Sequence, residues 1–194
     1  MDKKILLVQE HKATGFKVFL TSLEDSHIRH LIKLAQDPSL VDLLGWNTFF
    51  ELDETEKFIE AISEYAFPFS RKSQPLVFGV YLEQEGLPIG YVVLKGLNMD
   101  LLTAEIGVAI LDKKYRKKGY GRLALKRLVK YTFENLRIQT IASAILSSNQ
   151  SSINMCKKTG FVVREVMYNS WSMPNGDLVD MVWMEITNPA GTKS

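Results

Sequence analysis

A basic, glycine-containing stretch runs from Lys113 to Gly121, between a predicted strand and a predicted long helix. Five of the six residues from 113 to 118 are lysine or arginine, although the whole chain has a formal net charge of only +2. Gly119 and Gly121 allow the backbone to turn sharply and to bring its N–H groups close to a ligand. The first turn of the helix adds further N–H donors and the positive end of the helix dipole. The stretch therefore predicts a binding site for an anion such as a diphosphate.

Two other interpretations of this stretch stay open. A basic run before a helix is often only a solvated face, and a lone G-x-G spacing has low specificity. A nucleic-acid surface would need interleaved aromatic side chains, for which only Tyr115 and Tyr120 are available, and a broader basic surface. We therefore expect no nucleic-acid partner.

The cysteine and histidine content excludes several kinds of site. Cys156 is the only cysteine, so the chain can form neither an internal disulfide nor a thiolate-rich zinc site. The three histidines all lie near the start and form no zinc-protease motif and no Ser-His-Asp set. We expect no bound metal.

Hydrophobic runs along the chain are short. None approaches the length of a membrane-spanning helix, and Ile5 to Val8 is too short for the core of a signal peptide. With the single cysteine, this pattern favours a soluble protein of a reducing compartment, most simply the cytoplasm, with no membrane partner.

The domain organisation follows from length and from the absence of linkers. A chain of 194 residues without a repeat or a Ser/Gly/Pro-rich segment is expected to form one domain. We expect an N-terminal extension over residues 1–15, a single domain over 16–187 and a frayed tail over 188–194.

Hydrophobic periodicity predicts the elements that position the basic stretch. Alternating or β-rich runs predict strands near 16–20, 76–82, 88–97, 103–111, 139–146, 162–173 and 178–185. Amphipathic patterns predict helices ending before Asp37-Pro38, opening at Asp53 or Thr55, covering 119–136, and running from Ser151 or Ser152 to Gly160. This order is typical of an α/β (α+β) domain with one mixed, mostly antiparallel sheet and helices on its faces.

Several motifs, in this order and on these elements, resemble one family. The run Arg116-Lys117-Lys118-Gly119-Tyr120-Gly121 matches the [RQ]-x-x-G-x-[GA] signature of the GNAT acetyltransferase superfamily. Asn149-x-x-Ser152, followed by Lys158-Thr159-Gly160-Phe161, is similar to a second block of that family. The match runs from about Phe16 to Ile186 and includes features of the RimJ/RimL-like branch, which holds ribosomal-protein N-terminal acetyltransferases and spermidine acetyltransferases.

The resemblance implies a fold and a cofactor site. The sheet would have about six to seven strands, with a V-shaped splay between the fourth and fifth main strands, 105–111 and 139–146. Acetyl-CoA would lie in this splay as co-substrate, its pantetheine arm paired with the backbone of Val108, Ala109 and Ile110. An N–H group there would also stabilise the oxyanion. The diphosphate and pantetheine would be held by a further set of residues: Arg116, Lys117, Lys118, Gly119, Tyr120, Gly121, Asn149 and Ser152. Helix capping is the alternative role for Asn149 and Ser152.

The chain departs from the family at the acid and base. Many relatives have a tyrosine acid where this chain has Cys156, and some have a glutamate where it has Ala144. The remaining candidates are Cys156 or Ser152 as acid and Glu105 as base, acting directly or through a water. Cys156 is otherwise a small buried hydrophobe, and Glu105 a solvent-facing or ion-paired strand residue.

The resemblance implies an acetyl-CoA-dependent N-acetyltransferase. Its acceptor would be a primary amine (a protein N-terminal α-amine, a polyamine or a small-molecule amine) that attacks directly in a ternary complex, and the protein would be a monomer or homodimer. The missing tyrosine and glutamate leave a non-catalytic acyl-CoA-binding or regulatory module as the alternative. Acidic residues from Glu51 to Glu64 would attract a cationic amine or simply form a solvated helix face. Trp46, Phe49 and Phe50 would line a pocket or fill core.

Overall fold

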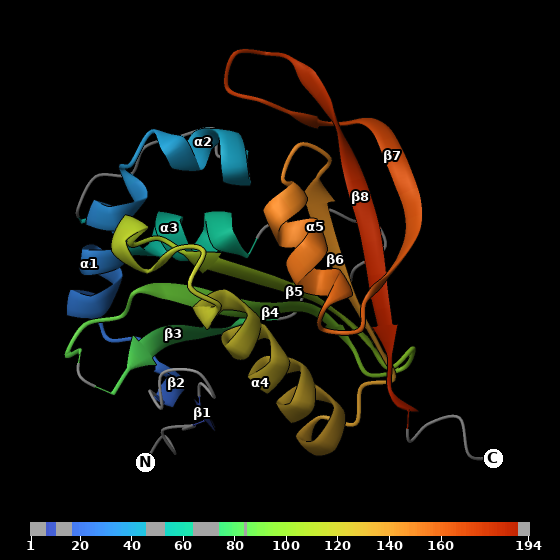
Figure 1. Ribbon diagram of the computed structural model, residues 1–194, viewed down its shortest axis with the longest axis horizontal. Coiled ribbons are helices and arrows are strands. Elements are labelled where there is room, and N and C mark those ends of the chain that lie inside the picture. The colour runs from blue at the N-terminus through green and yellow to red at the C-terminus, as the bar shows by residue number, and fades with distance from the viewer. Residues whose placement is uncertain (1–6, 11–16, 46–52, 64–73, 84, 190–194) are drawn as a thin grey trace.

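The computed structural model describes residues 7–10, 17–45, 53–63, 74–83 and 85–189. One eight-stranded sheet runs through the molecule in the order β1-β2-β3-β4-β5-β6-β8-β7 (Figure 1). Its strands are β1 (Leu7–Glu10), β2 (Lys17–Ser22), β3 (Leu76–Leu82), β4 (Gly90–Asn98), β5 (Thr103–Ile110), β6 (Thr140–Leu146), β7 (Val162–Ser172) and β8 (Leu178–Thr187). Neighbouring strands are antiparallel except β5 and β6. The predicted fold class is confirmed.

The parallel contact between β5 and β6 is short. The two strands pair at three positions, from Thr103 with Thr140 to Glu105 with Ala142. Beyond these positions no pairing joins them within residues 85–189, although β5 stays paired with β4 and β6 with β8. The strands therefore diverge, which produces the predicted V-shaped splay.

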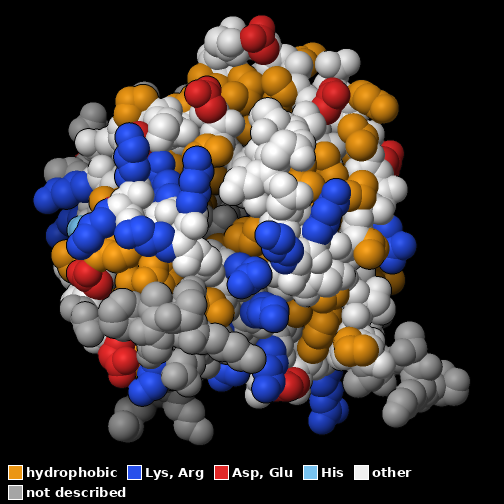
Figure 2. All heavy atoms as spheres, in the orientation of Figure 1, with side chains coloured by type: hydrophobic (Ala, Val, Ile, Leu, Met, Phe, Trp, Pro, Cys, Tyr) orange, Lys and Arg blue, Asp and Glu red, His pale blue; other side chains and the backbone are white. Residues whose placement is uncertain are grey.

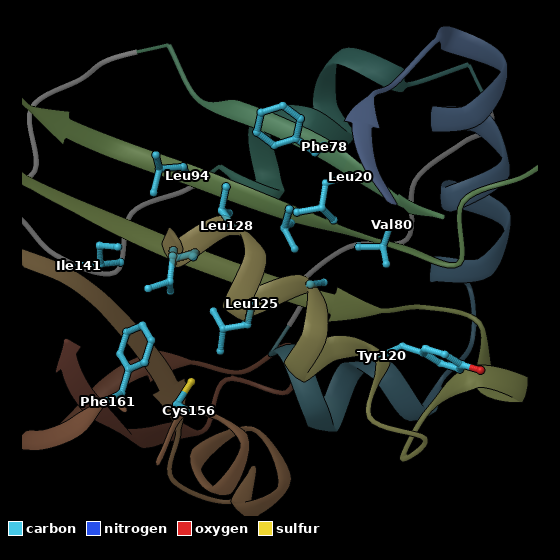
Figure 3. Close-up of a cluster of buried hydrophobic side chains, with 14 of the residues drawn as sticks. Leu20, Phe78, Val80, Leu94, Tyr120, Leu125, Leu128, Ile141, Cys156 and Phe161 are labelled. Atoms are coloured by element: carbon cyan, nitrogen blue, oxygen red, sulfur yellow. The ribbon is translucent and has the colours of Figure 1, made fainter. Parts of the chain in front are cut away.

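Helices cover both faces of the sheet. On one face, α1 (Asp25–Ala35), α2 (Ser39–Leu44) and α3 (Thr55–Ile62) pack over β4 and β5, in a core that includes Leu31, Phe58 and Tyr91. On the other, α4 (Tyr120–Asn135) and α5 (Gln150–Lys157) cover the sheet (Figure 1). The close-up shows Leu125 and Leu128 pointing from α4 into this second core (Figure 3).

The burial of each strand matches its place in the sheet. Eight of the nine residues of β4 are buried, as expected for a central strand with helices on both faces. By contrast, β7 is one of the two edge strands of this sheet, and none of its residues is fully buried. Among the described residues, no helix is both long and apolar enough to span a membrane.

Two elements add to those expected from the sequence. Leu7–Glu10, within the segment assigned to an extension, forms β1 and pairs antiparallel with β2, so the sheet has eight strands where six to seven were expected. Asp37-Pro38 does end α1, but α2 begins at once, because Asp37 accepts hydrogen bonds from the Ser39 N–H and hydroxyl. Trp46, Phe49 and Phe50 lie outside the described residues.

Candidate active site

The basic stretch forms a tight loop between β5 and α4. A single 3-10 turn, Lys113–Tyr115, is capped by Asp112, whose Oδ1 accepts from the Lys114 N–H at 2.8 Å. Lys117 (φ 60°) and Gly119 (φ 90°) then both adopt the left-handed region, and α4 begins at Tyr120. The glycine adopts this conformation at little cost, whereas a side chain at 119 would be strained.

This conformation presents several main-chain donors in one direction. The N–H groups of Lys117, Lys118, Gly119, Gly121 and Arg122 have no acceptor among the described residues. Successive N–H groups in such a turn form an anion-binding concavity, and the N-terminus of α4 adds its dipole. The geometry thus supplies the donors that the sequence analysis expected for a diphosphate.

A cavity of about 510 Å³, here called the loop cavity, lies under these donors. Its wall combines the end of β5, the loop, the start of α4 and one side of α5. The predicted cofactor residues on this wall are Val108, Ala109, Ile110, Arg116, Lys117, Gly119, Tyr120, Gly121, Asn149 and Ser152. Lys118 is exposed outside the wall, with its Nζ 5.9 Å from the ring centre of Tyr115.

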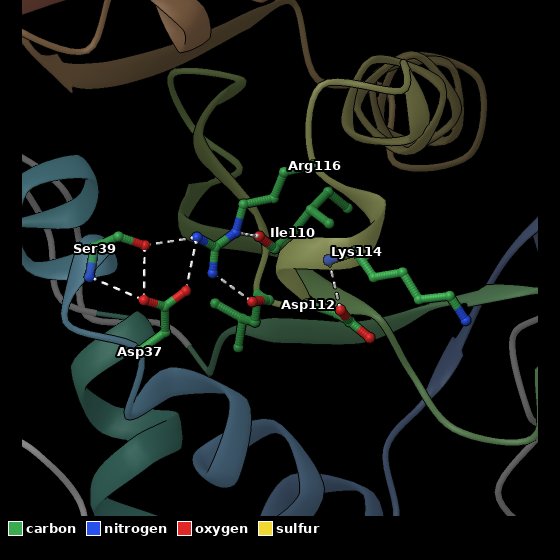
Figure 4. Close-up of polar contacts among 7 residues, drawn as sticks. Asp37, Ser39, Ile110, Asp112, Lys114 and Arg116 are labelled. Carbon is green, nitrogen blue, oxygen red and sulfur yellow. Dashed lines mark hydrogen bonds and ion pairs between the residues drawn. The ribbon is translucent and has the colours of Figure 1, made fainter.

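The Arg116 side chain braces the loop (Figure 4). Its Nε donates to the Ile110 carbonyl at 3.0 Å, a second nitrogen donates to the Leu111 carbonyl, and its Nη1 lies 3.0 Å from Asp37 and 2.9 Å from Ser39. Hydrogen bonds from Ser39 and the nearby guanidinium hold the pKa of Asp37 below its ordinary value. A phosphate contact by Arg116, as the sequence analysis expected, would require exchanging these bonds.

Asn149 links α5 to α2. Its Oδ1 accepts from the Ser152 N–H at 3.1 Å and so caps α5, while its Nδ2 donates to the Leu43 carbonyl at 2.8 Å. The capping role considered for Asn149 is therefore present in the structure. Ser152 is only partly buried and lines both this cavity and the next, so its hydroxyl lies on the shared wall.

A second cavity of about 200 Å³, here called the hairpin cavity, lies between β5 and β6 beside the loop cavity. Its wall draws on α2, α3, β4, β5, β6, α5 and the β7–β8 hairpin. The two cavities share six wall residues: Leu43, Leu44, Val108, Asn149, Ser152 and Met155. They therefore form one continuous groove across the splay.

A buried ion pair lies at the narrow end of this groove. Lys95 and Glu105 face each other on β4 and β5, with Nζ 3.1 Å from Oε1 and side chains 11% and 4% exposed. Glu105 is also the last residue of β5 that pairs with β6, so its carboxylate sits where the strands separate. This places the predicted base in the hairpin cavity with a lysine partner that the sequence analysis missed. The position of Lys95 within the apolar run of β4 was the signal in the sequence that could have indicated this buried partner.

Cys156 lies on the wall of the hairpin cavity but is 2% exposed. Burial raises the pKa of its thiol to about 12, although a hydrogen bond with Ser143 lowers it. Tyr91, on the opposite wall, has its pKa raised by complete burial. Both groups therefore carry their protons throughout the neutral range.

The β7–β8 hairpin closes the far end of the hairpin cavity. Trp171 donates from Nε1 to the Gly45 carbonyl at 3.0 Å, across 126 residues of sequence. Gly45 has φ 65° at the end of α2, and a Cβ there would lie 2.5 Å from the Trp171 Nε1. Trp171 was not singled out from the sequence, since only the fold brings β7 to α2.

The described carboxylates of the acidic stretch near α3 do not line the groove. Of its members, Asp53, Glu54, Glu56 and Glu60 are described, and none lines either cavity. Glu54 instead pairs with Lys57. Glu51 and Glu64 lie outside the described residues. Where they are described, these carboxylates form the solvated face that was one of the two interpretations.

Basic side chains surround the loop cavity on the surface of the molecule. Lys and Arg side chains gather on both sides of a hollow in the face that carries α4 and α5 (Figure 2). Basic residues on the loop cavity wall include Lys117, Arg122 and Lys158. The main-chain donors, the basic rim and the adjoining groove fit an elongated ligand with an anionic end.

Comparison with known proteins agrees with this geometry. A family model described as an acetyltransferase (GNAT) domain matches residues 17–162. The acetyltransferase PseH of Campylobacter jejuni is 23% identical over 143 residues, which cover 74% of this chain and 82% of that protein. The uncharacterized N-acetyltransferase p20 of Bacillus licheniformis is 22% identical over 159 residues, which cover 82% of this chain and 85% of that protein. The spermidine N-acetyltransferase of Vibrio cholerae, solved with CoA and spermine, superposes with a TM-score of 0.72 at 21% identity, covering 88% of this chain and 95% of that one.

Proposed function

The chain belongs to the GNAT acetyltransferase family, and from this premise we propose that it moves an acetyl group from acetyl-CoA to a primary amine by direct attack in a ternary complex. One observation carries the proposal. A continuous groove crosses the splay, with main-chain N–H donors at one end and the Glu105 carboxylate at the other. Each reactant then has its own entrance and both meet between β5 and β6.

The loop cavity is assigned to the co-substrate. Main-chain N–H groups from Lys117 to Gly121 would hold the diphosphate, with the positive end of α4 behind them. The edge of β5 from 106 to 110 faces the splay without a neighbouring strand within residues 85–189. An extended pantetheine arm can pair with this edge as an added strand, which brings the thioester to the shared wall.

The reaction needs positioning more than strong acids and bases. The amine nitrogen forms a bond to the thioester carbon, the carbon–sulfur bond breaks, and the products are an amide and free CoA. A main-chain N–H near Val108 would stabilise the oxyanion that forms in between. We assign Glu105 as the base that accepts the proton of the amine, directly or through a water. It is the only carboxylate among the described wall residues of the hairpin cavity.

In this proposal Ser152, and not Cys156, donates a hydrogen bond to the sulfur of the leaving CoA. A thiol with a pKa of about 12 is a weak donor to a thiolate whose pKa is about 8.5, so Cys156 is assigned to packing. Ser152 lines both cavities, and its hydroxyl is assigned as the hydrogen-bond donor to the leaving group. A thiolate of this pKa needs no stronger acid near neutral pH.

Two measurements on the same preparation test the proposal. Calorimetry should show acetyl-CoA binding in the micromolar range, and a thiol-trapping assay should show CoA release that depends on an added primary amine. Binding without release by any amine would support the non-catalytic acyl-CoA-binding module instead. Absence of binding would contradict both.

A further inference from the structure

Among its described wall residues, the hairpin cavity has one ion pair, a few polar side chains such as Ser143, Asn149 and Ser152, and otherwise mostly apolar groups. Its described wall includes Leu44, Ile62, Ile145, Trp171 and Met181, and its only charged residues are Lys95 and Glu105. We infer that the acceptor is a primary amine with a single charge, attached to an apolar or aromatic group, rather than a polyamine. This inference rests on the proposed function and names the substrate class of the same site.

The first argument is charge balance. Lys95 and Glu105 face each other at 3.1 Å, so together they contribute no net charge to the cavity. Glu105 is the only acidic residue among the described residues of the wall. An incoming ammonium therefore finds one carboxylate, and a lysine shares it.

The second argument is the cost of the other charges on a polyamine. Each ammonium that leaves water needs a counter-charge and hydrogen bonds to compensate its lost hydration. A monoamine needs one such partner and can use Glu105, whereas the second and third ammonium groups of spermidine would find no further carboxylate among the described wall residues. The described carboxylates of α3 are not among the residues that line the cavity.

The third argument is shape. A cavity of about 200 Å³ is somewhat larger than an apolar cavity of roughly 150 Å³ that takes up benzene. It therefore suits a phenyl ring or a branched aliphatic chain on the amine. Trp171, held by its bond to the Gly45 carbonyl, closes the cavity above and supplies a flat apolar surface.

The experiment compares matched acceptors in the CoA-release assay. Glycinamide, leucinamide and phenylalaninamide carry the same α-amine and differ in the side group, and spermidine supplies the polyamine. The expected kcat/KM for leucinamide and phenylalaninamide exceeds that for glycinamide by about tenfold or more, with spermidine below all three. Hexanoyl-CoA is compared with acetyl-CoA as donor in the same assay.

Three variants connect this preference to the cavity. Ala144→Leu narrows it and should bring the ratio of phenylalaninamide to glycinamide close to one. Met181→Ala enlarges it and should raise the ratio of phenylalaninamide to leucinamide. Met99→Ala removes a methionine that is 58% exposed and away from the wall, and should leave both ratios unchanged.

The outcomes separate this inference from the proposed function. Spermidine turned over as well as phenylalaninamide would overturn the inference and leave the acetyltransferase proposal standing. Equal rates with all three amides, together with faster transfer from hexanoyl-CoA, would assign the cavity to the acyl chain and also overturn it. No CoA release with any amine would overturn the proposed function, and the inference with it.

Discussion

At the α4 end of the groove, main-chain N–H groups within the short stretch 117–122 line one cavity, whereas at the hairpin end side chains from α2 to β8 line the other. The first site depends on backbone conformation at Lys117 and Gly119. The second depends on strand register and on long-range contacts such as that of Trp171 with Gly45. Donor binding and acceptor choice should therefore respond to different kinds of substitution.

The largest expected effect concerns the ion pair of the hairpin end. Glu105→Gln should lower the free energy of unfolding by about 3 kcal/mol or more, because the buried Lys95 ammonium loses the carboxylate facing it. Lys95→Met combined with Glu105→Met should cost less than Glu105→Gln alone, because no buried charge is then left behind. Urea denaturation measures both. A double variant that is at least as unstable as Glu105→Gln would contradict this account.

The next effect concerns the loop end. Gly121→Glu should weaken acetyl-CoA binding about 100-fold, or about 2.7 kcal/mol, because the carboxylate enters the loop cavity beside Met155 and Ile110 and repels the diphosphate. Calorimetry measures the change. Gly86→Glu is the matched control, since a Cβ at Gly86 meets nothing within 4 Å. Equal affinity for the two variants would show that the anion does not lie under the loop.

A smaller effect distinguishes bracing from phosphate binding. Arg116→Lys should lower the free energy of unfolding by about 1–2 kcal/mol, since lysine cannot reproduce the fork that reaches two carbonyls and Asp37. The exposed Arg29→Lys should change it by less than about 0.5 kcal/mol. Thermal and urea unfolding measure both. If Arg116→Lys instead left stability intact and weakened acetyl-CoA binding, Arg116 would be a phosphate ligand.

The smallest effect is a dependence of stability on pH. Cys156 titrates at about 12 in the folded chain and near its ordinary value of 9 when unfolded, because burial disfavours the thiolate. The unfolded chain therefore loses its proton first, so stability is complete below pH 9 and falls as pH rises toward 12. Between pH 8 and pH 10 the wild type should lose about 1 kcal/mol more than Cys156→Ala. If the two proteins lost the same free energy of unfolding over this range, the Cys156 thiol would be accessible to solvent in the folded chain.

The loop end could be predicted from sequence because its residues are contiguous. Gly119 and Gly121, the basic run and the following helix together indicated main-chain donors, and the structure has them there. The role of Arg116 could not be predicted in the same way. Its side chain reaches Asp37 and Ser39, which lie close to it only after α1 and α2 fold over β5.

The hairpin end was predicted only in part, because register decides it. Glu105 was named as a candidate base, but its pairing with Lys95 follows from the alignment of β4 with β5. Cys156 was placed on the correct helix, while its raised pKa depends on how deeply α5 packs. Contacts between residues far apart in sequence leave no local pattern to recognise.

The short pairing of β5 with β6 has a mechanical consequence. Strands β1 to β5 form one part of the sheet, and β6, β8 and β7 form the other. Only three residue pairs, between β5 and β6, join the two parts within residues 85–189. A ligand that pairs with the open edge of β5 would form the backbone hydrogen bonds that β6 does not make there. Because such a ligand binds only the folded chain, its binding raises the free energy of unfolding. A saturating ligand should therefore hold the two parts of the sheet together and stabilise the whole chain.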